Sequence, residues 1–209
     1  MVRDQIERRG ITDTRLLEVL RSVPRHAFVS AAQKHWAYSD GALRIAQGQT
    51  ISQPFIVALM TESLELQGDE TVLEVGTGSG YQAAIVAQLC AQVHSIERHA
   101  ALSVSAGAVF ESLGIENIQL HIGDGSLGLP ELAPFDAIIV TAAAPQAPRA
   151  LLDQLADGGR LVTPVGSRYR QVLEIWRRNG DELQRRQIAA VAFVPLIGIE
   201  GWNEADWRE

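Results

Sequence analysis

The sequence predicts an α/β protein with a doubly wound, mostly parallel sheet that ends in an antiparallel hairpin and carries an N-terminal helical extension. From residue 70 onward, short apolar strands alternate with helix-like runs, which is typical of a parallel sheet with helices on both faces. The tail breaks this alternation with two strand-like runs joined at Asn179-Gly180, a strong hairpin signal. We therefore expect one domain over residues 1–209, with a helical or lid segment over 1–69 and the α/β core over 70–209.

The N-terminal segment contains two apolar runs with helical spacing. One follows Thr12, which could cap it, and the other begins at Pro54, since proline suits a first helical turn. Residues 37–53 have weak periodicity and are predicted to form an irregular lid or loop. In the core, the predicted parallel strands are 71–75, 93–97, 118–123, 136–142 and 159–166, and the predicted helices are 81–89, 100–114 and 148–155.

Composition excludes several classes of function. The formal net charge of −7 argues against a nucleic-acid partner, which would require a basic face. No apolar run approaches the ~20 residues of a membrane span, and the charged N-terminus lacks a signal peptide, so a cytoplasmic location is expected. One cysteine and five scattered histidines predict no metal site. No interface pattern stands out, so a monomer is expected.

A glycine-rich turn follows the first strand of the core, in the stretch "VLEVGTGSGYQAA". In a doubly wound sheet, ligands bind at the carboxyl ends of strands, and glycines let the backbone approach them closely. The spacing is G-x-G-x-G, which differs from the dinucleotide fingerprint G-x-G-x-x-G, and no Gly-Lys-Ser/Thr follows it. The turn therefore points away from hydride transfer and from nucleotide hydrolysis.

Two acidic residues could bind the ligand of this turn. Glu97 ends the second strand and could accept hydrogen bonds from two ribose hydroxyls, although it could equally be an exposed strand-end charge. Asp124, in "GDG" after the third strand, could accept a hydrogen bond from an adenine amino group, or simply form the turn. An adenosine without phosphates fits both acids, and S-adenosylmethionine is the prime candidate. The pattern resembles class I methyltransferases.

Further blocks sharpen the resemblance. "VPRHAFV", "GQTISQP", "VLEVGTGSGYQAA", "APFDAIIVTAAAP", "GGRLVTPVG" and "FVPL" occur in this order, up to about residue 196, and resemble the protein-L-isoaspartate (D-aspartate) O-methyltransferase family. The resemblance implies an enzyme that moves a methyl group from S-adenosylmethionine to the free α-carboxylate of isoaspartyl residues in damaged proteins, leaving S-adenosylhomocysteine. The methyl ester then closes to a succinimide, which returns in part to aspartate.

The resemblance also implies the site residues. Ser52 would be the catalytic residue, as a hydrogen-bond donor that orients the acceptor, although its position before Pro54 also suits a helix cap. The expected cofactor residues are Glu74, Gly76, Thr77, Gly78, Ser79, Gly80, Glu97, Arg98, Asp124, Gly125 and Thr141. The expected substrate residues are Thr50, Ile51, Val194, Pro195 and Leu196, the last three of which could instead belong to an edge strand.

No strong general base is required for such a reaction, because a carboxylic acid with a pKa near ~3.9 is already ionised at neutral pH. Arg44 and Ala192 depart from the family's usual pattern and leave the acceptor preference open. Two alternatives therefore remain. One is a class I methyltransferase with a different carboxylate acceptor, and the other is a non-catalytic module that binds the cofactor or a peptide.

Overall fold

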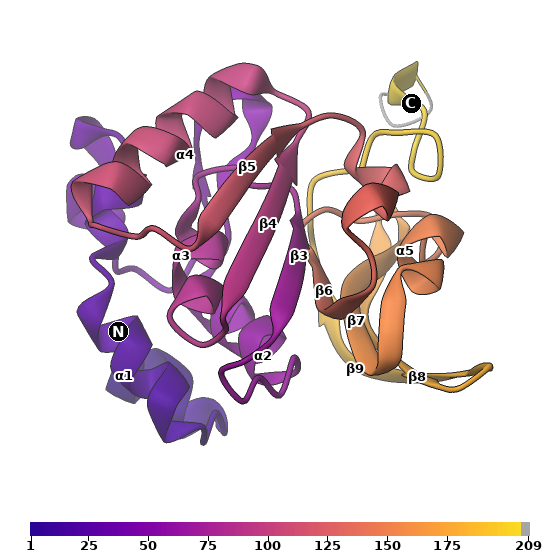
Figure 1. The fold of residues 1–209 in the computed structure, drawn as a ribbon. Coiled ribbons are helices and arrows are strands. Elements are labelled where there is room, and N and C mark those ends of the chain that lie inside the picture. Colours follow the sequence, from indigo (N-terminus) through magenta and orange to yellow (C-terminus); the bar gives the residue numbers. More distant parts are fainter. Residues whose placement is uncertain (206–209) are drawn as a thin grey trace.

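A seven-stranded sheet forms the centre of the computed structural model, which describes residues 1–205 (Figure 1). Its strands are β3 (Thr71–Val75), β4 (Gln92–Glu97), β5 (Ile118–Ile122), β6 (Phe135–Val140), β7 (Leu155–Ser167), β8 (Arg170–Asn179) and β9 (Glu182–Val191). Their order is β5-β4-β3-β6-β7-β8-β9, and the first five run parallel. The last two pair antiparallel through the turn at Gly180, so both the predicted sheet and its terminal hairpin are confirmed.

The helices divide unequally between the two faces of the sheet (Figure 1). They are α1 (Thr14–Ser22), α2 (Pro54–Glu62), α3 (Tyr81–Ala87), α4 (Ala100–Ser112) and α5 (Arg149–Asp153). The first four pack on one face, where Val72, Val93 and Ile139 are fully buried. Among the described residues, only α5 and short 3-10 turns pack on the other face, against Leu73, Ile138 and their neighbours. Within residues 1–205, no helix is long and apolar enough to cross a membrane.

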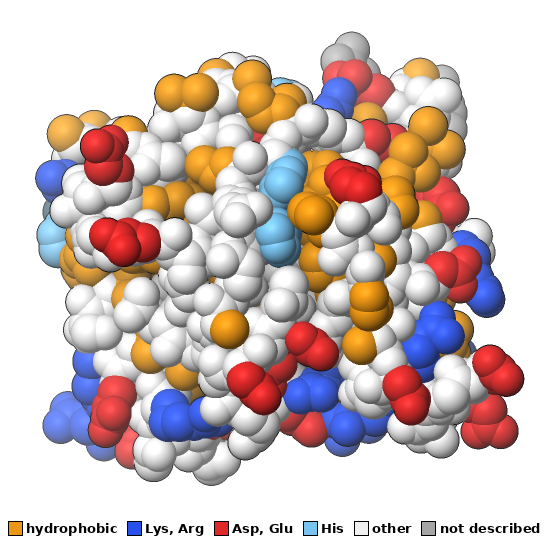
Figure 2. Space-filling model, in the orientation of Figure 1, with side chains coloured by type: hydrophobic (Ala, Val, Ile, Leu, Met, Phe, Trp, Pro, Cys, Tyr) orange, Lys and Arg blue, Asp and Glu red, His pale blue; other side chains and the backbone are white. Residues whose placement is uncertain are grey.

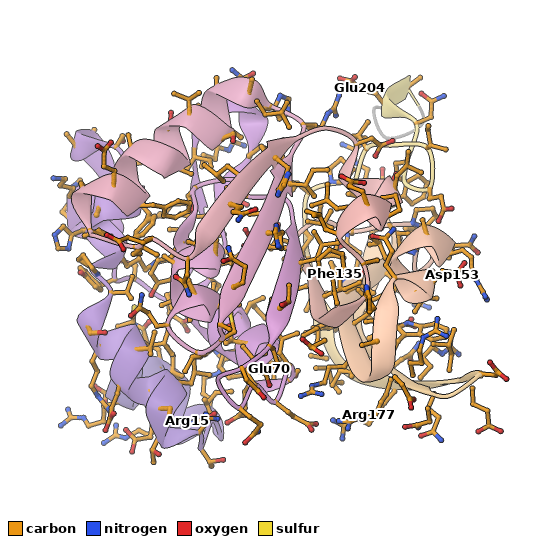
Figure 3. All side chains as sticks on the ribbon, viewed as in Figure 1. Arg15, Glu70, Phe135, Asp153, Arg177 and Glu204 are labelled. Atoms are coloured by element: carbon orange, nitrogen blue, oxygen red, sulfur yellow. The ribbon has the colours of Figure 1, made fainter. Side chains whose placement is uncertain are left out.

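Helices lie on both faces of the sheet, as expected, but the second face is covered over only part of its width. Figure 1 shows no helix in front of β4 and β5. His94 and His121 lie on this side of the two strands, with Nδ1 of one 3.2 Å from Nε2 of the other, and Figure 2 shows histidine side chains at the surface there. Phe135, labelled in Figure 3, packs edge-on against the ring of His94. The helix that would cover this half is replaced by short turns between β5 and β6.

The N-terminal segment matches its prediction in outline. Helix α1 is capped by Asp13, whose Oδ1 accepts hydrogen bonds from the amides of Arg15 and Leu16, so the expected cap at Thr12 is wrong by one residue. Helix α2 begins at Pro54, as predicted. Between the helices the chain forms short 3-10 turns at Arg25–Phe28, Ala31–Trp36 and Ala46–Gly48, together with loops and two short paired strands, β1 (Leu43–Arg44) and β2 (Thr50–Ile51).

The strand order reverses beside β3. Its neighbours β4 and β6 leave it in opposite directions along the sheet, so the turn over residues 76–80 lies at a topological switch point. The segment after β6 and the segment around β2 converge on the same end of the sheet. This convergence places the candidate site.

Candidate functional site

A pocket lies at the carboxyl ends of β3, β4 and β6. It is bounded by the glycine turn, by the β2 segment and by residues 194–197. The predicted residues that line it are Thr50, Ile51, Ser52, Gly76, Thr77, Gly78, Ser79, Glu97, Arg98, Gly125, Thr141, Val194, Pro195 and Leu196. The predicted residues that do not line it are Glu74, Gly80 and Asp124. Segments that are far apart in the sequence therefore meet around one space.

The shape of the turn depends on residues without a side chain. Gly76 has φ of 96°, and a Cβ at this position would collide with the hydroxyl of Thr141. That hydroxyl instead donates to the carbonyl of Gly76 at 2.6 Å, which holds the end of β6 against the turn. Gly80 has φ of 86°, and its Cβ would lie 2.8 Å from the ring of Phe110. Gly80 therefore lets α3 and α4 pack closely, beneath the lining of the pocket.

Glu97 faces the pocket and supports the turn. Its Oε2 accepts the amide of Gly78 at 3.0 Å, and its Oε1 accepts the amide of His99 at 2.9 Å. The side chain is buried and points inward, unlike an exposed strand-end charge. Each carboxylate oxygen has a second lone pair, so Glu97 can still accept ribose hydroxyls.

Glu74 lies under the turn, fully buried between β3 and α3. Its Oε2 accepts a hydrogen bond from Ser95, whose hydroxyl is 2.6 Å from the hydroxyl of Thr77. Oε1 has no hydrogen-bond partner. Burial raises the pKa of Glu74 to about 8, against the opposing effect of Ser95, and the charge of Glu97 raises it further. Glu74 is therefore mainly neutral at pH 7 and supports the turn from below.

Asp124 forms the local turn that was its alternative interpretation. Its Oδ1 accepts the amide of Ser126 at 2.9 Å, and its Oδ2 accepts the amide of Ile199 at 2.8 Å. The carboxylate thus ties the β5 end to the C-terminal loop, while its adenine contact stays a prediction. Arg98 lines the pocket and forms an ion pair of 3.7 Å with Glu204, a residue labelled in Figure 3.

Ser52 is half-buried, and its hydroxyl makes no hydrogen bond among the described residues. Helix α2 has Gln53 at its N-cap position and no side-chain cap bond, so Ser52 does not cap it. Ser52 and Thr50 also line a second hollow, whose other walls are mostly apolar. Those walls include Ala42, Ile56, Ala190, Val191, Ala192 and Phe193. Ser52 therefore stands between two spaces with an unused donor.

The segment after β9 closes the pocket opposite the turn. The amide of Ala143 donates to the carbonyl of Val194, and the amide of Leu196 donates to the carbonyl of Ala143, both at 2.8 Å. Pro195 therefore pairs with the "TAAAP" segment after β6, beyond the edge strand itself. Tyr81 also lines the pocket, although it is not among the predicted site residues. Its position directly after Gly80 was the available signal.

These contacts fit an adenosyl group without phosphates. Glu97 offers acceptor oxygens, the turn approaches the space through glycine backbone, and Arg98 is the one lining arginine among the described residues. Ile96, Ala142 and Leu196 supply apolar walls. Within residues 1–205, no group of three or more histidine, cysteine or acidic side chains could hold a metal ion.

Comparisons with known proteins agree with this geometry. The profile of the protein-L-isoaspartate(D-aspartate) O-methyltransferase family matches residues 1–201. A curated protein-L-isoaspartate O-methyltransferase from Roseiflexus castenholzii (strain DSM 13941 / HLO8) is 50% identical over 206 residues, covering 99% of this chain and 94% of the relative.

Two solved structures share the fold. One is named protein-L-isoaspartate O-methyltransferase, with TM-score 0.86 and 28% identity over 96% of this chain and 67% of the other. The second comes from Plasmodium falciparum, bears the same family name and is in complex with S-adenosyl-L-homocysteine. Its TM-score is 0.78, with 26% identity over 92% of this chain and 95% of the other.

Proposed function

Because the chain belongs to the protein-L-isoaspartate(D-aspartate) O-methyltransferase family, we propose that it methylates the free α-carboxylate of L-isoaspartyl residues in damaged proteins and peptides. The ester would then close to a succinimide, which hydrolyses in part to aspartate. The observation that carries this proposal is the unused hydroxyl of Ser52, which lies between the pocket and the second hollow.

The pocket would hold S-adenosylmethionine. When bound, this cofactor supplies an electrophilic methyl group on a positively charged sulfur. Glu97 would accept the ribose hydroxyls, and the backbone of residues 76–79 would lie against the ligand. Asp124 and Gly125 would lie on the adenine side, and Thr141 would form an uncharged wall. Glu74 and Gly80 would act through the turn that they support.

The second hollow would receive the substrate peptide. Ser52 would donate a hydrogen bond to one oxygen of the acceptor carboxylate and orient the other toward the methyl carbon. Thr50 lines both spaces, whereas Ile51 and residues 194–196 line the pocket, where they would contact the isoaspartyl end of the peptide as it reaches the cofactor. The carboxylate is already ionised, so the residues need to position it and exclude water, without abstracting a proton.

Incubation with radiolabelled S-adenosylmethionine and paired isoaspartyl and aspartyl peptides tests the proposal. Label on the isoaspartyl peptide alone is the expected result, and the label should be lost in base because it is an ester. Label on a small carboxylate, with neither peptide modified, would identify a different acceptor. Cofactor binding without transfer to any carboxylate would identify a binding module.

We also propose that residues 1–209 act as one domain and as a monomer in the cytoplasm, without a metal or a nucleic-acid partner. The net charge of −7 supports the absence of a nucleic-acid partner, and the scattered histidines support the absence of a metal. Light scattering across a range of concentrations would test the monomer. Assays in the presence of a chelator would test metal independence.

A further inference from the structure

Arg25 is fully buried, which is unusual for an arginine. It lies in the 3-10 turn that follows α1, within the "VPRHAFV" block. No ion pair described within residues 1–205 includes it. Its Nε donates to the carbonyl of Ala37 at 2.7 Å, and its Nη2 donates to the carbonyl of Ser52 at 2.6 Å. A buried cation therefore holds the backbone of the serine that faces the acceptor.

One terminal nitrogen of Arg25, Nη1, makes no hydrogen bond among the described residues, and neither does the buried hydroxyl of Tyr81. The guanidinium carbon lies 4.8 Å from the centroid of the Tyr81 ring, and Tyr81 lines the pocket. Burial lowers the pKa of Arg25 to about 10, partly offset by Tyr81, so the side chain stays charged at neutral pH.

A buried charge without an acidic partner is costly for the folded protein. An apolar residue would fill the same volume without that cost, but it would neither bind two carbonyl groups nor supply a positive charge. The hydrogen bonds and the positive charge of Arg25 both act beside Ser52, because one of the two carbonyl groups belongs to that residue. An anionic acceptor beside Ser52 would provide the negative charge that the described residues do not.

We propose that Arg25 is a positioning residue for the acceptor carboxylate. Through Nη2 it fixes the backbone of Ser52, and through its charge it makes the space beside Ser52 favourable for an anion. This inference rests on the proposed function, because it assumes that the acceptor carries a carboxylate. It assigns the selection of charged over neutral acceptors to a residue outside the lining of both hollows.

The test compares two peptides on protein saturated with S-adenosylhomocysteine. One carries the isoaspartyl carboxylate, and the other carries the neutral amide at the same position. Arg25→Met is expected to reduce the preference for the carboxylate by about tenfold or more, because the positive charge behind Ser52 and the hydrogen bond that fixes the Ser52 backbone are both lost. Affinity for S-adenosylhomocysteine should stay within about twofold of the wild type. Equal weakening of both peptides would overturn the proposal, because it would indicate a purely structural role.

Arg160→Met is the matched control. Arg160 also donates to two backbone carbonyls, but these belong to Leu64 and Glu65, which line neither hollow, whereas Arg25 binds the carbonyl of Ser52, which lines both. Its replacement should leave the peptide preference unchanged, whereas an equal fall would overturn the assignment to Arg25.

If Arg25→Met does not fold, Arg25→Lys provides the test of the proposal. Lysine keeps the charge but lacks the fork that reaches both carbonyls. The preference of Arg25→Lys for the carboxylate over the amide should stay within about threefold of the wild type. Its kcat should fall by about tenfold or more, because the hydrogen bond to the backbone of Ser52 is lost. An unchanged kcat would overturn the proposal. If the wild type does not methylate the isoaspartyl peptide, the proposed function fails. The binding preference for the carboxylate over the amide, compared between wild type and variants, is a separate measurement and tests the role of Arg25.

Discussion

The amide of Gly78 donates to Oε2 of Glu97 at 3.0 Å, which joins the turn after β3 to the acid that ends β4. The residue proposed to bind the ribose therefore also sets the shape of the turn. Removal of this carboxylate would affect the ligand both directly and through the backbone.

Glu97→Ala should weaken the binding of S-adenosylhomocysteine by about 10- to 100-fold, since hydrogen bonds to a charged group contribute about 1.5–3 kcal/mol. Isothermal titration calorimetry would measure the dissociation constant. Glu111→Ala, at an exposed position of α4, is the control and should not change it. An unaltered constant for Glu97→Ala would refute the ribose assignment.

Ser52→Ala should slow methyl transfer on the order of 10²-fold, the effect expected when an acceptor is misplaced by about 1 Å. The hydroxyl caps no helix, so stability and affinity for S-adenosylhomocysteine should change little. Single-turnover rates with an isoaspartyl peptide would measure the effect. Ser22→Ala, at an exposed serine that ends α1, serves as control. Parallel losses in rate and cofactor affinity would exclude the orienting role.

Gly76→Ala should destabilise the protein and weaken cofactor binding, because its Cβ would collide with the Thr141 hydroxyl. Gly10→Ala is a close control, since Gly10 has φ of 101° and open space around it. In Gly10→Ala the free energy of unfolding should fall only by the cost of a left-handed backbone for alanine, about 1–2 kcal/mol. Overpacking should add about 1–3 kcal/mol at Gly76.

Urea unfolding would measure the loss of stability in Gly76→Ala and in Gly10→Ala. Adding Thr141→Ala to Gly76→Ala should recover part of the additional loss. Equal losses at the two glycines would mean that the contact with Thr141 is unimportant.

Glu74 should make stability depend on pH. Its pKa is raised from the ordinary value of 4.5 to about 8 in the folded protein, so between these values the folded state binds more protons than the unfolded state. The stabilisation is fully present below pH 4.5 and is lost as the pH rises through about 8. The free energy of unfolding should fall by up to about 1.4 kcal/mol per pH unit within this window.

Glu74→Gln carries no titrating proton, so it isolates this effect. Urea unfolding of both proteins without ligand, from pH 5 to 8, would give the difference between them. The stability of Glu74→Gln relative to the wild type should increase as the pH rises. Parallel curves would show that Glu74 is ionised in the folded state throughout.

The sequence predicts the structure correctly where a local pattern of residues determines it. The core strands follow from short apolar runs, and the hairpin follows from Asn179-Gly180, whose glycine adopts φ of 57°. The cap of α1 was misplaced because Thr12 and Asp13 are both capping residues, and only the backbone geometry selects Asp13.

The features that the sequence does not predict depend on contacts between segments that are distant in the chain. The open face over β4 and β5 follows from the absence of a long helix between β5 and β6, which the apolar strands do not reveal. Most predicted site residues do line the pocket, but Glu74 and Asp124 bind the chain itself. Arg25 was missed because arginine is generally exposed, so no sequence pattern predicts its burial.

The pocket and the second hollow have only Thr50 and Ser52 in common. The two ligands proposed for them would therefore meet beside these two side chains, and the transferred methyl group would cross from one space to the other at this point.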